Sequence, residues 1–436
     1  MPSAELTRRA TTPPPLSPLS RLRLNTAVAA GALAATASRL ARRGSGASIR
    51  GQVMQRIDPA SLSKLLQGRR TTVVSGTNGK TTTTHLLSAA VRSGLGAEAR
   101  RLVTNADGAN LHNGIASALS RAPRADIAIL ETDERVVADI VQLGRPELLV
   151  LLNFSRDQLD RHHEIKSLGS AWRATLERAG ASGPVVVANA EEPLIVWAAR
   201  KAHEVVWVDT ESVWHADSVL CPECGSALER TDPTDEIPGY WHCTGCDLAK
   251  PPTSWRVQGD TIIGPDGTVW EPKLRVPGAF NVSNAACALA AAVQLGVTPE
   301  QAITGMRTVT SPAGRFATGR FGTTNARLLL AKNPAGWTES LPIADAETLV
   351  LAIDAAAADG RDVSWLWDVD FEQLAGRTVV ATGPRAQDLA VRLTYAEVDH
   401  TVEPDLAKAM AGHDKPIDVI TTYTPFQKLR KMGGLA

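Results

Sequence analysis

A short run of residues, from Thr71 to Thr83, constrains the fold of this chain more than any other part of it. The run begins with β-branched residues, continues as the loop Gly76-Thr-Asn-Gly-Lys-Thr-Thr82 and passes into a segment of helical character. This order predicts a strand, a phosphate-binding loop and a helix. The usual pattern has a glycine five residues before Gly79, where this chain has Val74, so the loop is a variant. We expect the chain to bind ATP.

The residue types of the loop fit that chemistry. Glycine lets backbone N–H groups approach phosphate oxygens, which a Cβ would prevent. Lys80 is expected to reach the β- and γ-phosphates, and the Thr81 hydroxyl to hold Mg²⁺. The expected phosphate-binding residues are Gly76, Thr77, Asn78, Gly79, Lys80, Thr81 and Thr82.

Short apolar runs alternate with helical segments along the rest of the chain. Such runs predict an α/β fold, with a parallel sheet covered by helices on both faces and its chemistry at the carboxyl ends of the strands. The expected strands after the loop are 126–131, 148–153, 184–189 and 205–208. A second alternating region is expected to form a smaller α/β domain, with strands at 327–331, 349–353, 378–381 and 417–421.

These patterns divide the chain into three parts. Residues 1–48 are expected to form a disordered, proline-rich start and a helix, 49–310 the ATP-binding domain, and 311–436 the smaller domain, with the hinge near Pro312 and Gly314. The alanine-rich stretch 21–43 also has features of a signal or transit peptide, but Gly31 and the arginines after its apolar part make it a poor one. We expect instead a surface helix packed on the ATP-binding domain, with a membrane face nearby as a further hypothesis.

Composition excludes some function classes. Lys+Arg and Asp+Glu balance at 46 each, so no overall basic field recruits nucleic acid. No apolar run approaches about 20 residues, which argues against a transmembrane segment.

Four of the five cysteines lie in an insert, expected at 218–250. Two Cys-x-x-Cys pairs, Cys221 with Cys224 and Cys243 with Cys246, stand eighteen residues apart. This spacing is typical of a four-thiolate Zn²⁺ site, and four protein ligands make the site structural. Disulfides are the alternative. Cys287, in an alanine-rich segment, is expected to be a core residue.

Several segments resemble the ATPase domain of the Mur ligase family, which folylpolyglutamate synthases share. They are the loop itself and residues 153–162, 277–286 and 314–316. The resemblance implies that Glu131 supplies a Mg²⁺ ligand, for which a solvated acidic loop is the alternative. It also implies that Asn281 and Asn284 hold the adenine and neighbouring groups, and that Arg315 reaches the phosphates when the domains close.

The chain also departs from the family pattern. Gln158 stands where many Mur ligases have a histidine ligand of a second Mg²⁺, and no counterpart of their carbamylated lysine is evident. These departures put a second metal site in doubt.

Residues 331–336 and 358–368 are similar to the MurT family of synthetase subunits, and only about 70 residues precede the loop, too few for the nucleotide-recognition domain of other Mur ligases. This resemblance implies ATP-dependent amidation of the α-carboxylate of D-isoglutamate in lipid II, through an acyl phosphate. It implies ammonia from a glutaminase partner, GatD, and a cytoplasmic protein in peripheral contact with the inner membrane face.

In that family an aspartate matching Asp362 completes the Cys-His pair of the partner; a turn or helix-cap aspartate is the alternative. Trp365 and Trp367 nearby fit either core residues or partner anchors. The alternative functions are an amino-acid ligase of folylpolyglutamate synthase type, which would consume glutamate, and a zinc-ribbon nucleic-acid ATPase. Acidic residues around the cysteines disfavour the second of these.

Overall fold

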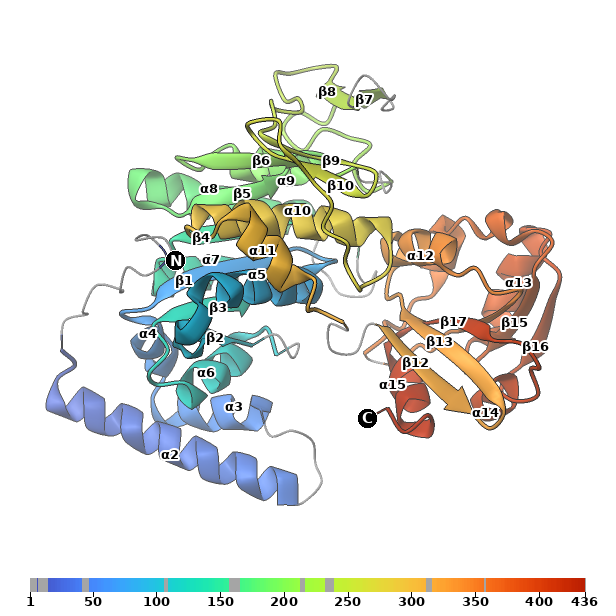
Figure 1. The fold of residues 1–436 in the computed structure, drawn as a ribbon, viewed down its shortest axis with the longest axis horizontal. Helices are drawn as coiled ribbons and strands as arrows, with labels where there is room; N and C mark the ends of the chain where they lie inside the picture. Colours follow the sequence, from blue (N-terminus) through green and yellow to red (C-terminus); the bar gives the residue numbers. More distant parts are fainter. Residues whose placement is uncertain are drawn as a thin grey trace.

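The computed structural model describes residues 6, 15–40, 47–105, 109–156, 165–211, 216–231, 239–310, 316–356 and 358–435. Two α/β units lie side by side, a small ribbon projects from one end of the larger unit, and a pair of helices lies at its other end (Figure 1). Because residues 311–315 fall outside the described ranges, the domain bounds expected from the sequence stay predictions.

The larger unit is built on a nine-stranded sheet with the order β11-β10-β9-β6-β5-β4-β1-β3-β2. The seven strands β9, β6, β5, β4, β1, β3 and β2 are parallel to one another. β10 and β11 are antiparallel additions at the β9 edge. The strands are β1 (Arg70–Ser75), β2 (Leu102–Thr104), β3 (Ile127–Glu131), β4 (Leu148–Leu151), β5 (Val185–Asn189), β6 (Val205–Asp209), β9 (Trp255–Gln258), β10 (Thr261–Ile263) and β11 (Val269–Trp270).

Helices cover both faces of this sheet, as expected for runs that are apolar at every position. Successive residues point to opposite faces, so Val73 packs in one core and Val74 in the other. The Val73 face is covered by α4 (Ser61–Leu66), α6 (His112–Arg121), α7 (Val137–Gly144), α8 (Ile165–Ala179) and α9 (Pro193–Ala199). The Val74 face is covered by α5 (Lys80–Leu95), α10 (Ala279–Gln294) and α11 (Pro299–Met306).

The smaller unit has a six-stranded sheet with the order β12-β13-β17-β14-β15-β16. Its four predicted strands are confirmed and are parallel, while β12 pairs antiparallel with β13. The strands are β12 (Phe316–Phe321), β13 (Thr324–Leu330), β14 (Thr348–Ala352), β15 (Thr378–Thr382), β16 (His400–Glu403) and β17 (Ile417–Thr421). The helices are α12 (Pro334–Ser340), α13 (Ala386–Tyr395), α14 (Leu406–Ala409) and α15 (Tyr423–Met432).

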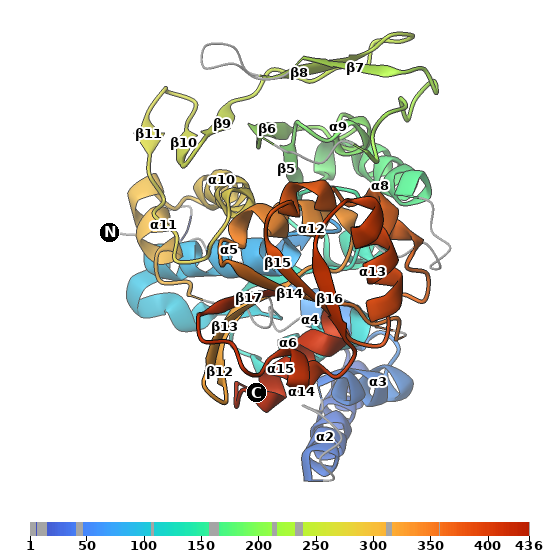
Figure 2. The same ribbon diagram turned by 90° about the vertical axis from the view of Figure 1, so that its right-hand side faces the viewer.

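Two further segments extend the larger unit at its two ends. The cysteine-containing insert includes an antiparallel pair, β7 (Leu228–Thr231) and β8 (Tyr240–Cys243). At the opposite end, α2 (Pro18–Leu40) and α3 (Ala47–Ile57) pack against each other, and α3 rests on α6 (Figures 1 and 2). The helix expected in the N-terminal part is confirmed as α2. Among the described helices, none combines the length and apolarity needed to cross a bilayer.

Candidate active site

The phosphate-binding loop joins β1 to α5 and depends on its two glycines. Gly76 and Gly79 have φ angles of 142° and 80°, values that favour glycine. A Cβ on Gly76 would lie 2.9 Å from the backbone nitrogen of Asn153, and one on Gly79 would lie 2.3 Å from Asn284 Oδ1. The loop is therefore a backbone cradle that a larger residue would fill. Val74, which replaces the usual first glycine, is a fully buried residue of β1, so the turn begins only at Gly76.

Lys80 lies across this loop. Its ammonium donates to the carbonyl of Gly76 and, at 3.0 Å, to that of Thr77, and it forms a 3.1 Å ion pair with Glu134. Glu134 belongs to the polar run after β3, and no motif in the sequence indicates its role. The ion pair holds the lysine beside the cradle, within reach of an anion bound there.

The polar residues after β4 brace the loop from the adjacent strand. Asn153 Oδ1 accepts from the backbone N–H of Asn78 at 2.8 Å, and its carbonyl accepts from that of Thr77 at 2.9 Å. Ser155 donates its backbone N–H to the Thr77 hydroxyl at 3.1 Å and accepts from the Asn78 amide at 3.1 Å. The sequence placed these residues at a strand end, but only the three-dimensional structure reveals the bracing.

The two asparagines of α10 reach the same loop. The Asn284 amide donates to Asn281 Oδ1 at 3.1 Å, and Asn284 Oδ1 accepts from the Thr83 hydroxyl at 3.3 Å. Both are buried. Residues some 200 positions apart in the chain thus meet at one end of α5.

Glu131 ends β3, the strand beside β1, and lies in register with Val74. One carboxylate oxygen, Oε1, accepts from the Asn110 amide at 3.2 Å, whereas Oε2 is buried without a hydrogen-bond partner among the described residues. Leaving a buried carboxylate oxygen unpaired is costly. An orphaned anionic oxygen near a phosphate cradle is the donor that a hard cation such as Mg²⁺ prefers, so the residues present fit a Mg²⁺ site.

The two units meet at the loop. The side chain of Asn78 exchanges hydrogen bonds with that of Asn333 at 3.3 and 3.4 Å. Asn333 is fully buried and caps the N-terminus of α12, accepting from the backbone N–H of Gly336 at 2.9 Å. The cap of a helix in the smaller unit therefore touches the nucleotide loop of the larger one.

Some expected site residues lie elsewhere. Arg315 and Gln158 fall outside the described residues. Asp362 is exposed on the smaller unit, and among the described residues its carboxylate hydrogen-bonds only to Ser364, with the backbone N–H at 2.8 Å. That bond is the main cause of a lowered pKa for Asp362, which keeps the carboxylate ionised.

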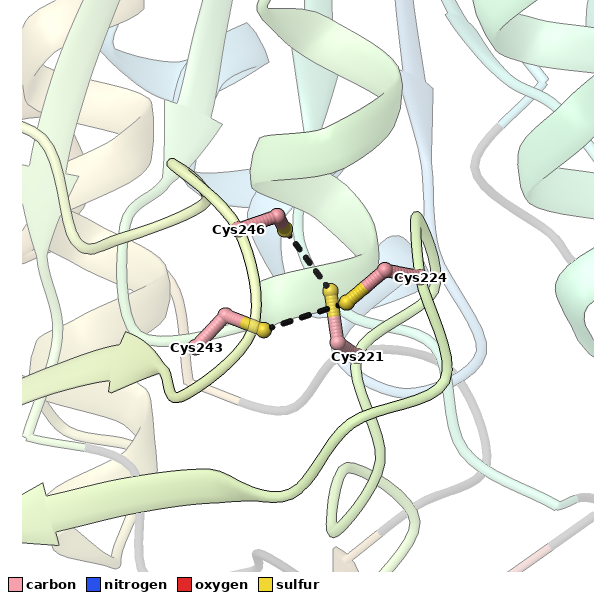
Figure 3. Close-up of side chains that lie close together, drawn as sticks. All are labelled: Cys221, Cys224, Cys243 and Cys246. Atoms are coloured by element: carbon pink, nitrogen blue, oxygen red, sulfur yellow. Dashed lines mark hydrogen bonds between the residues drawn. The ribbon is translucent and has the colours of Figure 1, made fainter.

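The four insert cysteines converge, as Figure 3 shows. Their sulfur atoms lie within 4.8 Å of one another, with Cys221 and Cys246 3.6 Å apart and Cys224 and Cys243 3.4 Å apart. Zinc–sulfur bonds of about 2.3 Å separate the sulfurs of a tetrahedron by about 3.8 Å. The cluster thus has the dimensions of a four-thiolate metal site, and none of the cysteines forms a disulfide.

The insert is fastened to the larger unit through the first cysteine pair. Glu223, between Cys221 and Cys224, accepts from Trp197 Nε1 at 2.6 Å and pairs with Arg173 and Arg200 at 3.1 and 2.9 Å. This clamp and the metal cluster hold the same turn, so loss of a metal ion is expected to weaken the attachment of the insert.

The carboxyl ends of β5 and β6 carry a buried charged cluster that the sequence analysis did not identify. Lys250 pairs with Glu191 and, at 2.9 Å, with Asp209. Among the described residues the adjacent Glu192 has no such partner, and burial raises its pKa to about 8. Glu192 is therefore protonated in the folded protein at neutral pH.

Comparison with known proteins identifies relatives for both units. The family model described as "Mur ligase middle domain" matches residues 74–292, and that described as "MurT ligase C-terminal" matches 330–426. The chain is 30% identical over 404 residues to the lipid II isoglutaminyl synthase (glutamine-hydrolyzing) subunit MurT of Staphylococcus aureus strain COL, covering 86% of this chain and 90% of that protein. It is 28% identical to the corresponding subunit of Streptococcus pneumoniae, covering 90% and 93%.

Solved structures support the fold. A pseudomurein peptide ligase type C from Methanothermus fervidus superposes with a TM-score of 0.62 at 18% identity, covering 84% of this chain and 78% of that one. A Mycobacterium tuberculosis folylpolyglutamate synthase, complexed with ADP and AMPPCP, gives a TM-score of 0.56 at 17% identity, covering 89% and 99%. At these identities the similarity concerns the fold alone.

Proposed function

The chain belongs to the MurT family within the Mur ligases, and from this premise we propose that it is the ligase subunit that amidates the α-carboxylate of D-isoglutamate in the lipid II stem peptide. The observation that carries the proposal is the contact between the nucleotide loop and the smaller unit, through Asn78 and Asn333. A carboxylate held between the two units would lie next to the phosphates of ATP.

The reaction follows from carboxylate chemistry. A carboxylate is a poor electrophile at neutral pH, so its oxygen first takes the terminal phosphoryl group of ATP and becomes an acyl phosphate. Ammonia then attacks the carbonyl carbon, the bond from that carbon to the phosphate oxygen breaks, and a proton leaves the nitrogen. Phosphoryl transfer needs mainly positioning and charge stabilisation, which the cradle from Gly76 to Thr82 and Lys80 supply.

We assign the remaining nucleotide contacts as the family pattern suggests. Thr81 and Glu131 are assigned to hold Mg²⁺, which when bound neutralises phosphate charge. Asn281 and Asn284 are assigned to the adenine side of the nucleotide, and Arg315 to the phosphates on domain closure. The orphaned oxygen of Glu131 and the packing of Asn284 against Gly79 support these roles.

Ammonia is proposed to come from a partner subunit, the glutaminase GatD. The relatives are named as subunits of a glutamine-hydrolyzing synthase. All five cysteines lie in the described ranges: four form the thiol cluster, and Cys287 is fully buried with a pKa raised to about 12 by that burial. Cys287 is thus unsuited to be a glutaminase nucleophile, because the reactive form is an accessible thiolate. The other four thiols, including the exposed Cys224, are assigned to the metal cluster.

We propose that the partner docks on the smaller unit around Asp362. Trp365 is a core residue packed against Trp337, whereas Trp367 is 55% exposed and stacks edge-on with Tyr395, itself 72% exposed. Exposed aromatic pairs are typical interface anchors. Asp362, in the same segment, is then positioned to orient the histidine of the partner's Cys-His pair.

The thiol cluster is proposed to bind one structural Zn²⁺, and the domain division to follow the sequence, with 49–310 as the ATP-binding domain and 311–436 as the partner-binding domain. The protein is proposed to act in the cytoplasm at the inner face of the membrane, where its lipid-linked substrate is anchored.

Mass spectrometry of lipid II after incubation with ATP and Mg²⁺ tests the function. With ammonium as nitrogen source the chain alone is expected to convert one carboxylate to an amide, and with glutamine only when the glutaminase is added. Lys80→Ala should abolish both reactions. Attachment of glutamate to a folate, without amidation of lipid II, would instead assign the chain to the folylpolyglutamate synthase class. Only the similarity of fold supports that class.

A further inference from the structure

The N-terminal helices α2 and α3, here called the helical hairpin, have a charge pattern unlike the rest of the chain. Residues 6–57 contain nine arginines and no lysine, aspartate or glutamate, although the whole chain is neutral. In the described part of the hairpin, none of Arg21, Arg23, Arg39, Arg50 and Arg56 forms an ion pair with an acidic residue. The pKa of Arg50 is lowered by its burial and by the nearby Arg121 and Arg39.

Small residues on one face of α2 let it pack closely on α3, and α3 in turn packs on the larger unit. Ala27, Gly31 and Ala35 recur at four-residue spacing and are buried against α3. A Cβ on Gly31 would lie 2.7 Å from the Met54 side chain and 2.8 Å from the Arg50 carbonyl, so the two helices approach closely. α3 approaches α6 just as closely, since a Cβ on Gly51 would collide with the backbone of Asn113. The hairpin is thus a firm part of the larger unit.

The opposite face of α2 is exposed and carries three leucines in line, flanked by polar residues such as Thr26 and Thr36. Leu22, Leu33 and Leu40, here called the α2 stripe, are 64%, 74% and 81% exposed. Spacings of eleven and seven residues are close to three and two helical turns, so the three leucines lie along one line. Arg21 and Arg39, five turns apart, run parallel to this line on one side of it. Figures 1 and 2 both place α2 at an outer end of the molecule, and Figure 1 shows it away from the smaller unit.

We propose that the hairpin binds the surface of an anionic phospholipid bilayer, with the α2 stripe inserted at the headgroup boundary and the arginines on lipid phosphates. A helix with an apolar line, a cationic flank and no acidic residue is suited to lying in the interface. Charge complementarity selects this occupant, because the five arginines of α2 and α3, with no acidic residue in either helix, would repel a second copy of the hairpin. At 23 residues α2 is about 35 Å long and lies along the surface, since no described helix is suited to spanning it.

Sedimentation of the full chain with vesicles tests the proposal. One set of vesicles is pure phosphatidylcholine and the other contains about one-third phosphatidylglycerol; neither contains lipid II, so the result does not depend on the proposed function. Binding is expected only to the anionic vesicles and should weaken as salt is added. Arg21→Gln with Arg39→Gln should weaken it about 25-fold, from about fivefold per arginine. The triple change Leu22→Gln, Leu33→Gln, Leu40→Gln should weaken it at least tenfold.

Matched control variants distinguish binding through the hairpin from a general effect of lost charge or lost apolar surface. Lys273→Gln with Lys415→Gln removes the same charge from side chains that are 69% and 75% exposed elsewhere, and Val219→Gln with Val269→Gln replaces apolar side chains that are 58% and 56% exposed. Both controls should bind as the native chain does. Equal losses of vesicle binding in the control and hairpin variants, or vesicle binding that the hairpin substitutions leave unchanged, would overturn the proposal. So would light scattering that shows a dimer dissociated by the stripe changes, without anionic vesicle binding.

Discussion

At the scale of single residues, two buried carboxyl groups lead to opposite conclusions about function. In the part of the chain that the structure describes, Glu131 keeps an unpaired oxygen beside the nucleotide loop and is suited to a cation. Glu192 has no basic partner in hydrogen-bond contact there and is held neutral by burial. Strongly perturbed acids often mark functional sites, but Glu192, whose pKa burial raises to about 8, lies at the end of β5 and makes no contact with the loop among the described residues. Position relative to the cradle, rather than burial alone, separates the two.

Glu131→Gln is expected to raise the Mg²⁺ concentration that half-saturates ATP-dependent turnover by roughly tenfold or more, because a neutral amide is a weaker ligand for a hard cation. Titration of activity with Mg²⁺ measures this. Asp139→Asn, which changes an exposed acid on α7, is the control and should leave the titration unchanged. An equal titration for both variants would remove Glu131 from the metal site.

Glu192→Gln is expected to stabilise the protein increasingly as pH rises from about 5 to about 8. In the unfolded chain Glu192 loses its proton near its ordinary pKa of 4.5, but in the folded chain only near 8. Between these values the native state binds more protons, so the free energy of unfolding falls by up to about 1.4 kcal/mol per pH unit. The difference between variant and native denaturation midpoints should therefore grow across this range. A constant difference would contradict the raised pKa.

At the scale of elements, the sequence predicts the strands with continuous apolar runs and misses those without them. The predicted strands of both sheets are confirmed because burial on both faces demands apolar residues at every position. β12 and β16 carry polar residues such as Thr318, Arg320, His400 and Glu403 at sheet edges, where one side of the strand is free. The β10–β11 additions are too short to show a pattern.

The candidate site follows the same division. The loop residues and the α10 residues could be predicted because each set lies within a short contiguous motif of the sequence. Glu134, Ser155 and Asn333 could not, because their roles arise from contacts between residues that are 54, 77 and 255 positions apart. No local pattern encodes such a pairing.

The insert gives a prediction about an element. One Zn²⁺ per chain is expected by elemental analysis, and its removal by a chelator should make the region 218–250 sensitive to proteolysis, because the metal and the Glu223 clamp hold the same turn. Cys224→Ser should lose the metal, whereas Cys287→Ala should keep it. The absence of metal from both the native chain and the Cys287→Ala variant would contradict the zinc assignment.

At the scale of the whole molecule, three functions are proposed for three separate regions. The nucleotide loop lies where the two units meet, the aromatic pair Trp367 and Tyr395 lies on the smaller unit, and the helical hairpin lies at the far end of the larger one. Such separation lets a lipid-bound substrate, a nucleotide and a partner protein be engaged together.

Asp362→Asn tests the partnership at this scale. Glutamine-dependent amidation by the complex is expected to fall by about 10³–10⁴, because the partner's histidine would lose the carboxylate that orients it. Ammonium-dependent amidation should be unchanged, since the synthetase site is untouched. Asp370→Asn, another exposed acid of the same unit, is the matched control. Equal loss with both nitrogen sources would mean that Asp362 serves the fold or the synthetase instead.

The central claim is that this chain activates a carboxylate by phosphorylation at the loop from Gly76 to Thr82. The most direct measurement uses lipid II labelled with ¹⁸O in the α-carboxylate, ATP, Mg²⁺ and ammonium, and follows the label by mass spectrometry. One ¹⁸O is expected in inorganic phosphate for each amide formed, with unlabelled ADP as the other product. Label in AMP, or amide formed with unlabelled phosphate, would contradict the acyl phosphate and with it the proposed role of the loop.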